Sequence, residues 1–133
     1  MFDVVIPEVS PIQHECLTEA IYHEARGESY IGQLYVGFVI KNRVKSSKFP
    51  DTYCKVIDQP YQFSYNGMVD TTMYEHDARD FSSAVAEIIM TTPNPLPETV
   101  YYYHADWVLP SWDWSKLNEF QVVDRHIFYE ELG

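Results

Sequence analysis

Residues 32–44 read GQLYVGFVIKNRV, and this stretch decides the fold. Its apolar side chains spread around most of the circumference of a helix and are Tyr35, Val36, Phe38, Val39, Ile40 and Val44. A helix that is apolar on nearly all sides lies inside a domain. The pattern therefore predicts a central helix over residues 32–44, against which the other elements pack.

Further helices are predicted on both sides of this central helix. One begins after the N-cap Ser10, with Pro11 at its first helical position. A short helix over residues 52–57 follows, with Asp51 as its N-cap. An amphipathic helix over residues 77–90 ends at a cluster of prolines.

Short strands are predicted in the last third of the chain. Residues 100–104, 121–123 and 126–129 are rich in β-branched and aromatic side chains, which favour strands. Asp124 and Arg125 form the expected hairpin turn. The predicted fold class is α+β, with a helical core and a small antiparallel β-sheet formed mainly by the C-terminal third.

The composition fits a single domain over residues 1–133. The formal net charge of -11 argues against nucleic acid as a partner, because binding phosphates needs clustered Lys and Arg. The N-terminal residues 1–7 lack the basic and apolar regions of a secretory signal. No apolar run approaches the roughly 20 residues that span a bilayer. We expect synthesis in the cytoplasm without a signal peptide, and no membrane insertion.

Cys16 and Cys54 are the two cysteines of the chain. Their spacing matches neither a disulfide framework nor a zinc motif. We interpret them as two buried thiols. A bridge between them is the alternative if the protein works outside a cell.

Residues 20–28 read AIYHEARGE and concentrate charged side chains at the end of the first helix. Glu24 has apolar neighbours, and desolvation of such a carboxyl raises its pKa toward the range of an acid catalyst. Glu28 follows a glycine, so it does not simply continue the same helix face. The alternative is structural: Glu24 and Arg26 pair and cap the helix.

Aromatic and amide side chains suggest a sugar-binding surface. Flat rings suit the faces of sugars, and amides and hydroxyls bond to sugar hydroxyls and N-acetyl groups. The alternative is that these rings pack in the core. The residues are Tyr61, Gln62, Phe63, Ser64, Tyr65, Asn66, Tyr101, Tyr102, Tyr103, Trp107, Trp112 and Trp114.

Metal binding is the competing interpretation of the histidines. His23 and Glu24 resemble the start of a zinc-protease helix, but that motif needs a second His one turn later, where a glycine stands. His104, Asp106 and His126 could form a site, although a His on a strand is more often a packing residue. We expect no metal and no cofactor.

The order of these motifs resembles the SleB/CwlJ-type cell wall hydrolases, which include spore cortex-lytic enzymes and phage relatives. The resemblance covers roughly residues 15–130. The residues that carry it are 20–28 (AIYHEARGE), Gly32-Gln33, 39–44 (VIKNRV), Phe49-Pro50, Cys54, Val56-Ile57, Gln59, 62–64 (QFS), 103–105 (YHA), Val108, Pro110, Trp112 and 126–129 (HIFY).

The resemblance implies a lysozyme-like domain that cuts peptidoglycan glycan strands between N-acetylmuramic acid and N-acetylglucosamine. It implies a lytic transglycosylase, in which Glu24 acts first as acid and then as base and leaves a 1,6-anhydro product. The expected supporting or substrate-binding residues are Arg26, Glu28, Gln62, Phe63, Ser64, Tyr103, His104, Trp112 and His126.

Two alternative functions remain open at the level of sequence. One is an N-acetylmuramoyl-L-alanine amidase, which could be metal-dependent; the other is a non-catalytic wall-binding virion protein. In each case the expected partner is peptidoglycan, and we expect a monomer. A bare catalytic domain fits an enzyme that reaches the cell wall as a phage lysis or virion-associated protein.

Overall fold

The computed structural model describes residues 9–59, 65, 68 and 70–133. Over these residues the chain forms four α-helices, a short 3-10 helix and three strands. The helical elements are α1 (Pro11–Ala25), α2 (Tyr30–Lys45), α3 (Tyr53–Ile57), α4 (His76–Thr91) and η1 (Trp114–Lys116). The strands are β1 (Val100–Ala105), β2 (Leu117–Val123) and β3 (His126–Glu131).

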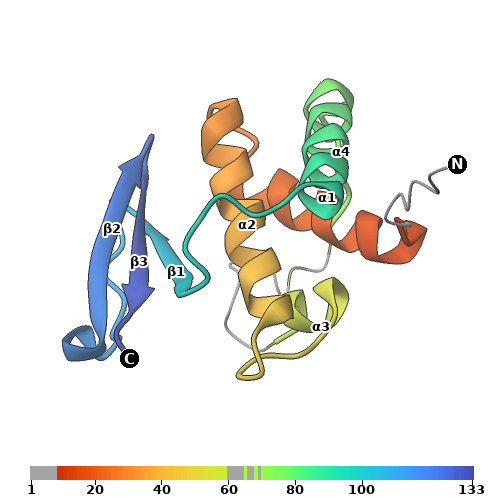
Figure 1. Ribbon diagram of the computed structural model, residues 1–133. Helices are drawn as coiled ribbons and strands as arrows, with labels where there is room; N and C mark the ends of the chain where they lie inside the picture. The colour runs from red at the N-terminus through yellow and green to blue at the C-terminus, as the bar shows by residue number, and fades with distance from the viewer. Residues whose placement is uncertain (1–8, 60–64, 66–67, 69) are drawn as a thin grey trace, which may run out of the picture.

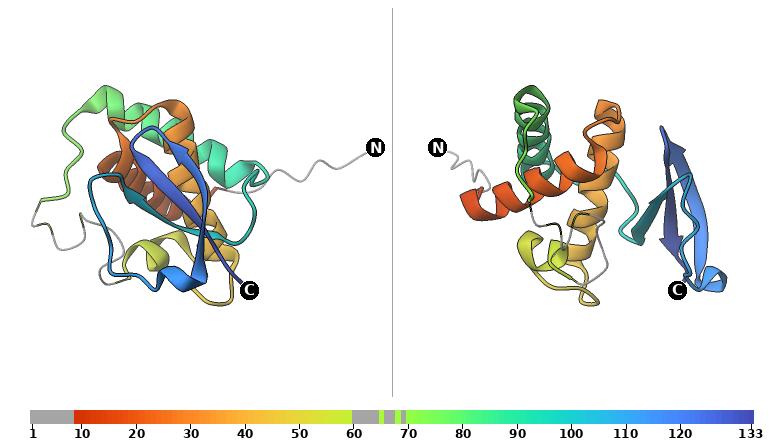
Figure 2. Two further views of the ribbon diagram at one scale, coloured as in Figure 1. Left: turned by 90° about the vertical axis from the view of Figure 1, so that its left-hand side faces the viewer. Right: turned by 180° about the vertical axis from the view of Figure 1, so that it is seen from behind.

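Helix α2 lies between the sheet and the other helices, as Figures 1 and 2 show. It contacts α1, α3 and α4 on one side and β1 on the other. Its side chains Val36, Val39 and Ile40 are fully or almost fully buried. The prediction of a central helix is therefore confirmed, and the helix is longer at its N-terminus than expected because Ser29 caps it.

Gly37 allows α2 to pack closely against its neighbours. A Cβ atom at this position would overlap Cδ1 of Ile89 in α4 and would lie 3.3 Å from Cδ1 of Ile21 in α1. Both isoleucines are fully buried, so neither can move into solvent. The close approach of α1 and α4 to α2 therefore depends on the missing side chain.

We expect Gly37→Ala to lower the free energy of unfolding by about 1–3 kcal/mol, since overpacking forces the buried neighbours to shift. Chemical denaturation followed by circular dichroism measures the change. Gly27→Ala is the matched control, because a Cβ at Gly27 would meet only Nη2 of Arg125, at 3.8 Å. Equal stability of the two variants would show that the core accommodates the methyl group.

The three strands described form an antiparallel sheet in the order β1-β3-β2. Strand β3 pairs with both neighbours, and Tyr103 of β1 lies opposite Phe128 of β3. Phe128 is fully buried toward the helices, so this is the inner face of the sheet. Because side chains alternate along a strand, His104 and Ile127 belong to the outer face. The predicted strands and their antiparallel arrangement are confirmed, although β2 begins at Leu117 and not at Gln121.

The turn between β2 and β3 ties the sheet to the helices. Asp124 has a positive φ of 50°, which fits the predicted hairpin turn. Its Oδ2 accepts hydrogen bonds from the backbone N–H and the hydroxyl of Ser29, at 2.9 and 2.6 Å. These bonds hold the pKa of Asp124 below its usual value. The turn is therefore fixed against the start of α2.

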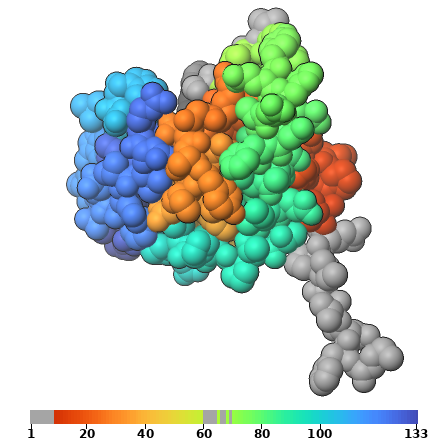
Figure 3. All heavy atoms as spheres, turned by 90° about the horizontal axis from the view of Figure 1, so that it is seen from above, coloured from red at the N-terminus to blue at the C-terminus, as the bar shows by residue number. Residues whose placement is uncertain are grey.

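Polar side chains of α2 donate hydrogen bonds to the backbone at the start of β1 and just before it. Asn42 Nδ2 donates to the backbone oxygens of Pro97 and Val100, at 2.9 and 3.1 Å. Buried Arg43 donates from Nε to the Tyr101 oxygen at 2.8 Å, and burial lowers the pKa of this guanidinium. The start of β1 is thus hydrogen-bonded to α2. Figure 3 shows the sheet, α2 and α4 side by side from above.

Two details of the sequence analysis are wrong. Cys16 in α1 and Cys54 in α3 form a disulfide, with Cα atoms 5.3 Å apart, and are not free thiols. Packing of α3 against α1 brings them within bridging distance, which sequence spacing does not reveal. The N-cap of α3 is Thr52 and not Asp51, because the Thr52 side chain accepts from the Lys55 N–H.

Candidate active site

Glu24 lies in the last turn of α1, one residue before the helix ends at Ala25. Its neighbours Ile21 and Ala25 are buried in the core, whereas Glu24 itself is half-buried. The backbone N–H of Glu28 bonds to the Ala25 oxygen at 2.9 Å and turns the chain after the helix. The carboxyl group is thus presented from a rigid helix end.

Two tyrosine hydroxyls lie within electrostatic reach of Glu24. Tyr103 comes from the inner face of β1 and Tyr65 from the segment between α3 and α4. Burial raises the pKa of Tyr103 well above its usual value, and the charge of Glu24 raises it further. Burial also raises the pKa of Tyr65, with added contributions from Glu19 and Glu24. Both phenols keep their protons at neutral pH and can donate hydrogen bonds.

Glu28 lies close to the turn between β2 and β3. Its side chain is 7% exposed, and its Oε1 lies 3.6 Å from Nε of Arg125 in the β2–β3 turn. Burial lowers the pKa of His126, and the nearby charge of Glu28 opposes this shift. The His126 ring packs edge-on against Tyr103, with centroids 5.2 Å apart. Tyr103 and His126 therefore connect the surroundings of the two glutamates.

The Arg26 side chain lies against Tyr22 and Glu75. Its guanidinium pairs with Glu75 and lies 4.6 Å from the centroid of the Tyr22 ring. There it lines a pocket of about 370 Å³. Tyr65 lines the same pocket, and the charge of Glu24 contributes to the raised pKa of this tyrosine. Arg26 thus shapes a neighbouring pocket that shares one wall with the surroundings of Glu24.

The other predicted site residues do not all gather at Glu24. His104 lies on the outer face of the sheet, opposite to the face that carries Tyr103. Trp112 packs against His104, with ring centroids 5.7 Å apart, so it belongs to that outer face too. The predicted sugar-binding residues Gln62, Phe63 and Ser64 lie outside the described residues.

The histidines considered for a metal site do not converge either. His126 pairs with Ala105, and His104 pairs with Ile127, so the two imidazoles project from opposite faces of the sheet. Among the described residues no group of three or more His, Cys, Asp or Glu is arranged to hold a metal ion. The residues proposed for a metal-dependent amidase therefore do not form one site.

Sequence reasoning missed the role of Arg125 in this arrangement. The sequence pattern places Arg125 only in the hairpin turn, yet Arg125 contacts Glu28 and lies 5.6 Å from the centroid of the Trp107 ring. The presence of an arginine in a turn does not predict an ion pair with a residue as distant in the sequence as Glu28. Only the docking of the turn against α2 brings it to Glu28.

The chain belongs to the cell wall hydrolase family. A family model described as Cell Wall Hydrolase matches residues 27–129. Spore cortex-lytic enzymes of Bacillus cereus and of Bacillus subtilis strain 168 are 32% and 33% identical to it over 114 residues, which is 86% of this chain. The match spans only 42% and 36% of the length of these two relatives.

Two solved structures have the same fold. The catalytic domain of the germination-specific lytic transglycosylase SleB from Bacillus anthracis superposes with a TM-score of 0.74 at 29% identity, covering 93% of this chain and 98% of that one. The catalytic domain of the Bacillus cereus SleB protein gives a TM-score of 0.74 at 28% identity, covering 93% and 94%. The predicted resemblance and the lysozyme-like α+β fold are confirmed.

Proposed function

We propose that this chain cleaves the glycan strand of peptidoglycan between N-acetylmuramic acid and N-acetylglucosamine as a lytic transglycosylase. The observation that carries the proposal is the inequality of the two glutamates. Glu24 lies at a helix end, and its charge acts on two protonated phenols, whereas the Glu28 side chain lies against Arg125, with Oε1 3.6 Å from Nε. One carboxyl group is thus placed for chemistry and the other for structure.

A single glutamate is sufficient for the proposed reaction. In its acid form Glu24 donates a proton to the glycosidic oxygen as that bond breaks. The resulting carboxylate takes the proton of the muramic 6-hydroxyl, whose oxygen attacks the anomeric carbon. The product is a 1,6-anhydro sugar, and no water is consumed. Hydrolysis with two carboxylates would instead need the second group as nucleophile or as base for water.

The phenols beside Glu24 support both steps. Because burial raises the pKa of Tyr103, its hydroxyl stays protonated and can donate to the substrate or to the carboxylate. Tyr65 offers a second donor of the same kind. We assign to both residues the positioning of the sugar against Glu24, with His126 supporting the Tyr103 ring.

The cell wall is the expected place of action. The B. anthracis relative is described as a lytic transglycosylase, and the family is that of cell wall hydrolases. None of the helices in the described part of the chain has the length and apolar character of a membrane span. The monomeric state and a phage lysis or virion role stay predictions.

Analysis of the products tests the proposed reaction. Purified peptidoglycan digested with the protein should release muropeptides that end in 1,6-anhydro-muramic acid, 18 Da lighter than the reducing ends that hydrolysis leaves, a mass difference of about one water. Mass spectrometry separates the two. Reducing ends would identify a muramidase, and free peptide stems would identify an amidase. Binding without any soluble product would support a wall-binding protein.

A further inference from the structure

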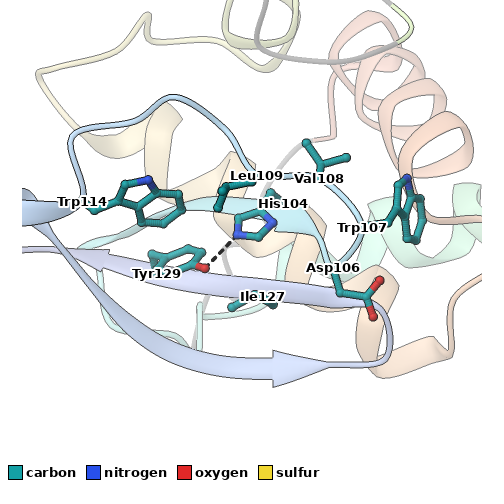
Figure 4. Close-up of a pocket in the computed structure, with 8 residues that line it drawn as sticks. All are labelled: His104, Asp106, Trp107, Val108, Leu109, Trp114, Ile127 and Tyr129. Carbon is teal, nitrogen blue, oxygen red and sulfur yellow. Dashed lines mark hydrogen bonds between the residues drawn. The ribbon is translucent and has the colours of Figure 1, made fainter.

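The outer face of the sheet carries an open groove that the proposed cleavage does not use (Figure 4). Its volume is about 650 Å³, within the range of ligand sites. Its lining includes Trp107, Leu109, Trp114 and Tyr129, with His104 and Asp106. Leu109 is 84% exposed and Trp107 is 68% exposed. Exposed apolar side chains gathered in one groove indicate a binding surface.

The floor of the groove is rigid. Nδ1 of His104 lies 2.7 Å from the Ala105 oxygen, which can only accept, so this nitrogen carries the proton. In the neutral ring Nε2 then accepts from the Tyr129 hydroxyl, also at 2.7 Å. The Trp114 ring packs against Tyr129, with centroids 5.2 Å apart. A ligand therefore meets rings that are already fixed, which lowers the entropic cost of binding.

The groove meets the candidate active site at one corner. Its wall residue Trp107 packs against the Arg125 guanidinium, at 5.6 Å from the ring centroid. Arg125 also contacts Glu28, with Nε 3.6 Å from Oε1. The Asp106 backbone N–H donates to the Arg125 oxygen at 2.8 Å, which holds the groove to the turn. Arg125 thus joins the groove to the surroundings of Glu28, and the path that we propose for a long polymer passes this side chain.

The chemistry of the lining favours the uncharged, hydroxyl-rich sugar rings of a glycan. Asp106 is the one carboxylate among the lining residues, and they include no Lys or Arg. With a formal net charge of -11 on the chain, an anionic surface is repelled. Ring faces such as those of Trp107 and Trp114 pack on the apolar faces of sugars, while the Asp106 carboxylate can accept from sugar hydroxyls.

We propose that this groove is an accessory site for the glycan strand, separate from the site of cleavage. The inference rests on the proposed function, because it takes the strand cut at Glu24 as the occupant. It goes beyond that function in placing the remainder of the strand across the outer face, on Trp107 and Trp114. The groove holds the substrate and takes no part in the bond changes.

Intrinsic fluorescence tests the proposal directly. The chain has three Trp residues, of which Trp107 and Trp114 line the groove and Trp112 packs on Trp114. In a Glu24→Gln background we expect a tetramer of N-acetylglucosamine to change Trp emission in a saturable way. Trp107→Ala should weaken binding roughly tenfold. Phe81→Ala, at an exposed ring on α4, is the matched control and should bind like the parent.

Two results would overturn the proposal. One is unchanged tetramer affinity in Trp107→Ala, and the other is a fluorescence response to neutral phospholipid vesicles or to self-association in place of the sugar. The exposed position of Trp107 makes a folding defect in this variant easy to exclude by its unfolding midpoint. Binding of the tetramer can be measured without cleavage. If the protein forms anhydro products but the tetramer does not bind to the groove, only the accessory site is refuted. Intact binding without anhydro products refutes only the proposed reaction.

Discussion

Glu24→Gln should lower the rate of peptidoglycan cleavage by roughly 10²–10⁴-fold, the range expected when a general acid or base is removed. The amide has nearly the same shape as the carboxyl group but cannot donate the proton that the glycosidic oxygen needs. Release of soluble muropeptides from purified peptidoglycan measures the rate. Thermal unfolding of the variant should match that of the parent, because Glu24 is half-buried and not part of the core.

Glu28→Gln is the matched control for this result. Glu28 contacts Arg125, whose side chain is 62% exposed, so the ion pair is partly screened and its loss costs little. We expect cleavage by this variant to stay within roughly tenfold of the parent, because Glu28 is assigned a structural role. Equal losses in the two variants would contradict the one-glutamate mechanism and would favour hydrolysis by two carboxylates.

The elements of the fold could be predicted from local patterns. The apolar circumference of residues 32–44 predicted a central helix because burial on all sides needs such a pattern, and α2 has that position. The aromatic run at residues 100–104 predicted β1, because aromatic and β-branched side chains favour strands. Both patterns are local in the sequence, so these elements can be predicted without knowing how they pack.

The grouping of the site residues could be predicted only in part. Tyr103 and His104 are adjacent in a strand, so the alternation of side chains along a strand predicts that they lie on opposite faces of the sheet. By contrast, the contact between Glu28 and Arg125 depends on how the β2–β3 turn docks on Ser29. Nothing local in the sequence encodes that docking.

Pairing of the cysteines is a second property that sequence spacing did not reveal, and its removal should have a large effect on stability. The bridge between Cys16 and Cys54 closes a loop with a sequence separation of 38. A loop of this size restricts the unfolded chain enough to contribute about 4 kcal/mol in the chain-entropy model. We expect reduction to lower the unfolding midpoint by about 10–20 °C, measured by circular dichroism with and without dithiothreitol.

The same bridge should support activity, because it joins α1, which carries Glu24, to α3, which precedes Tyr65 in the chain. If reduction loosens α3 from α1, Tyr65 loses its fixed position near the carboxyl group, and cleavage should slow at temperatures where the oxidised protein is still folded. The control is the double variant Cys16→Ala/Cys54→Ala, which should have the lower midpoint and no response to dithiothreitol. A parent protein with the same midpoint under oxidising and reducing conditions would show that the bridge contributes no stability, and the link between α1 and α3 would then rest on side-chain packing alone.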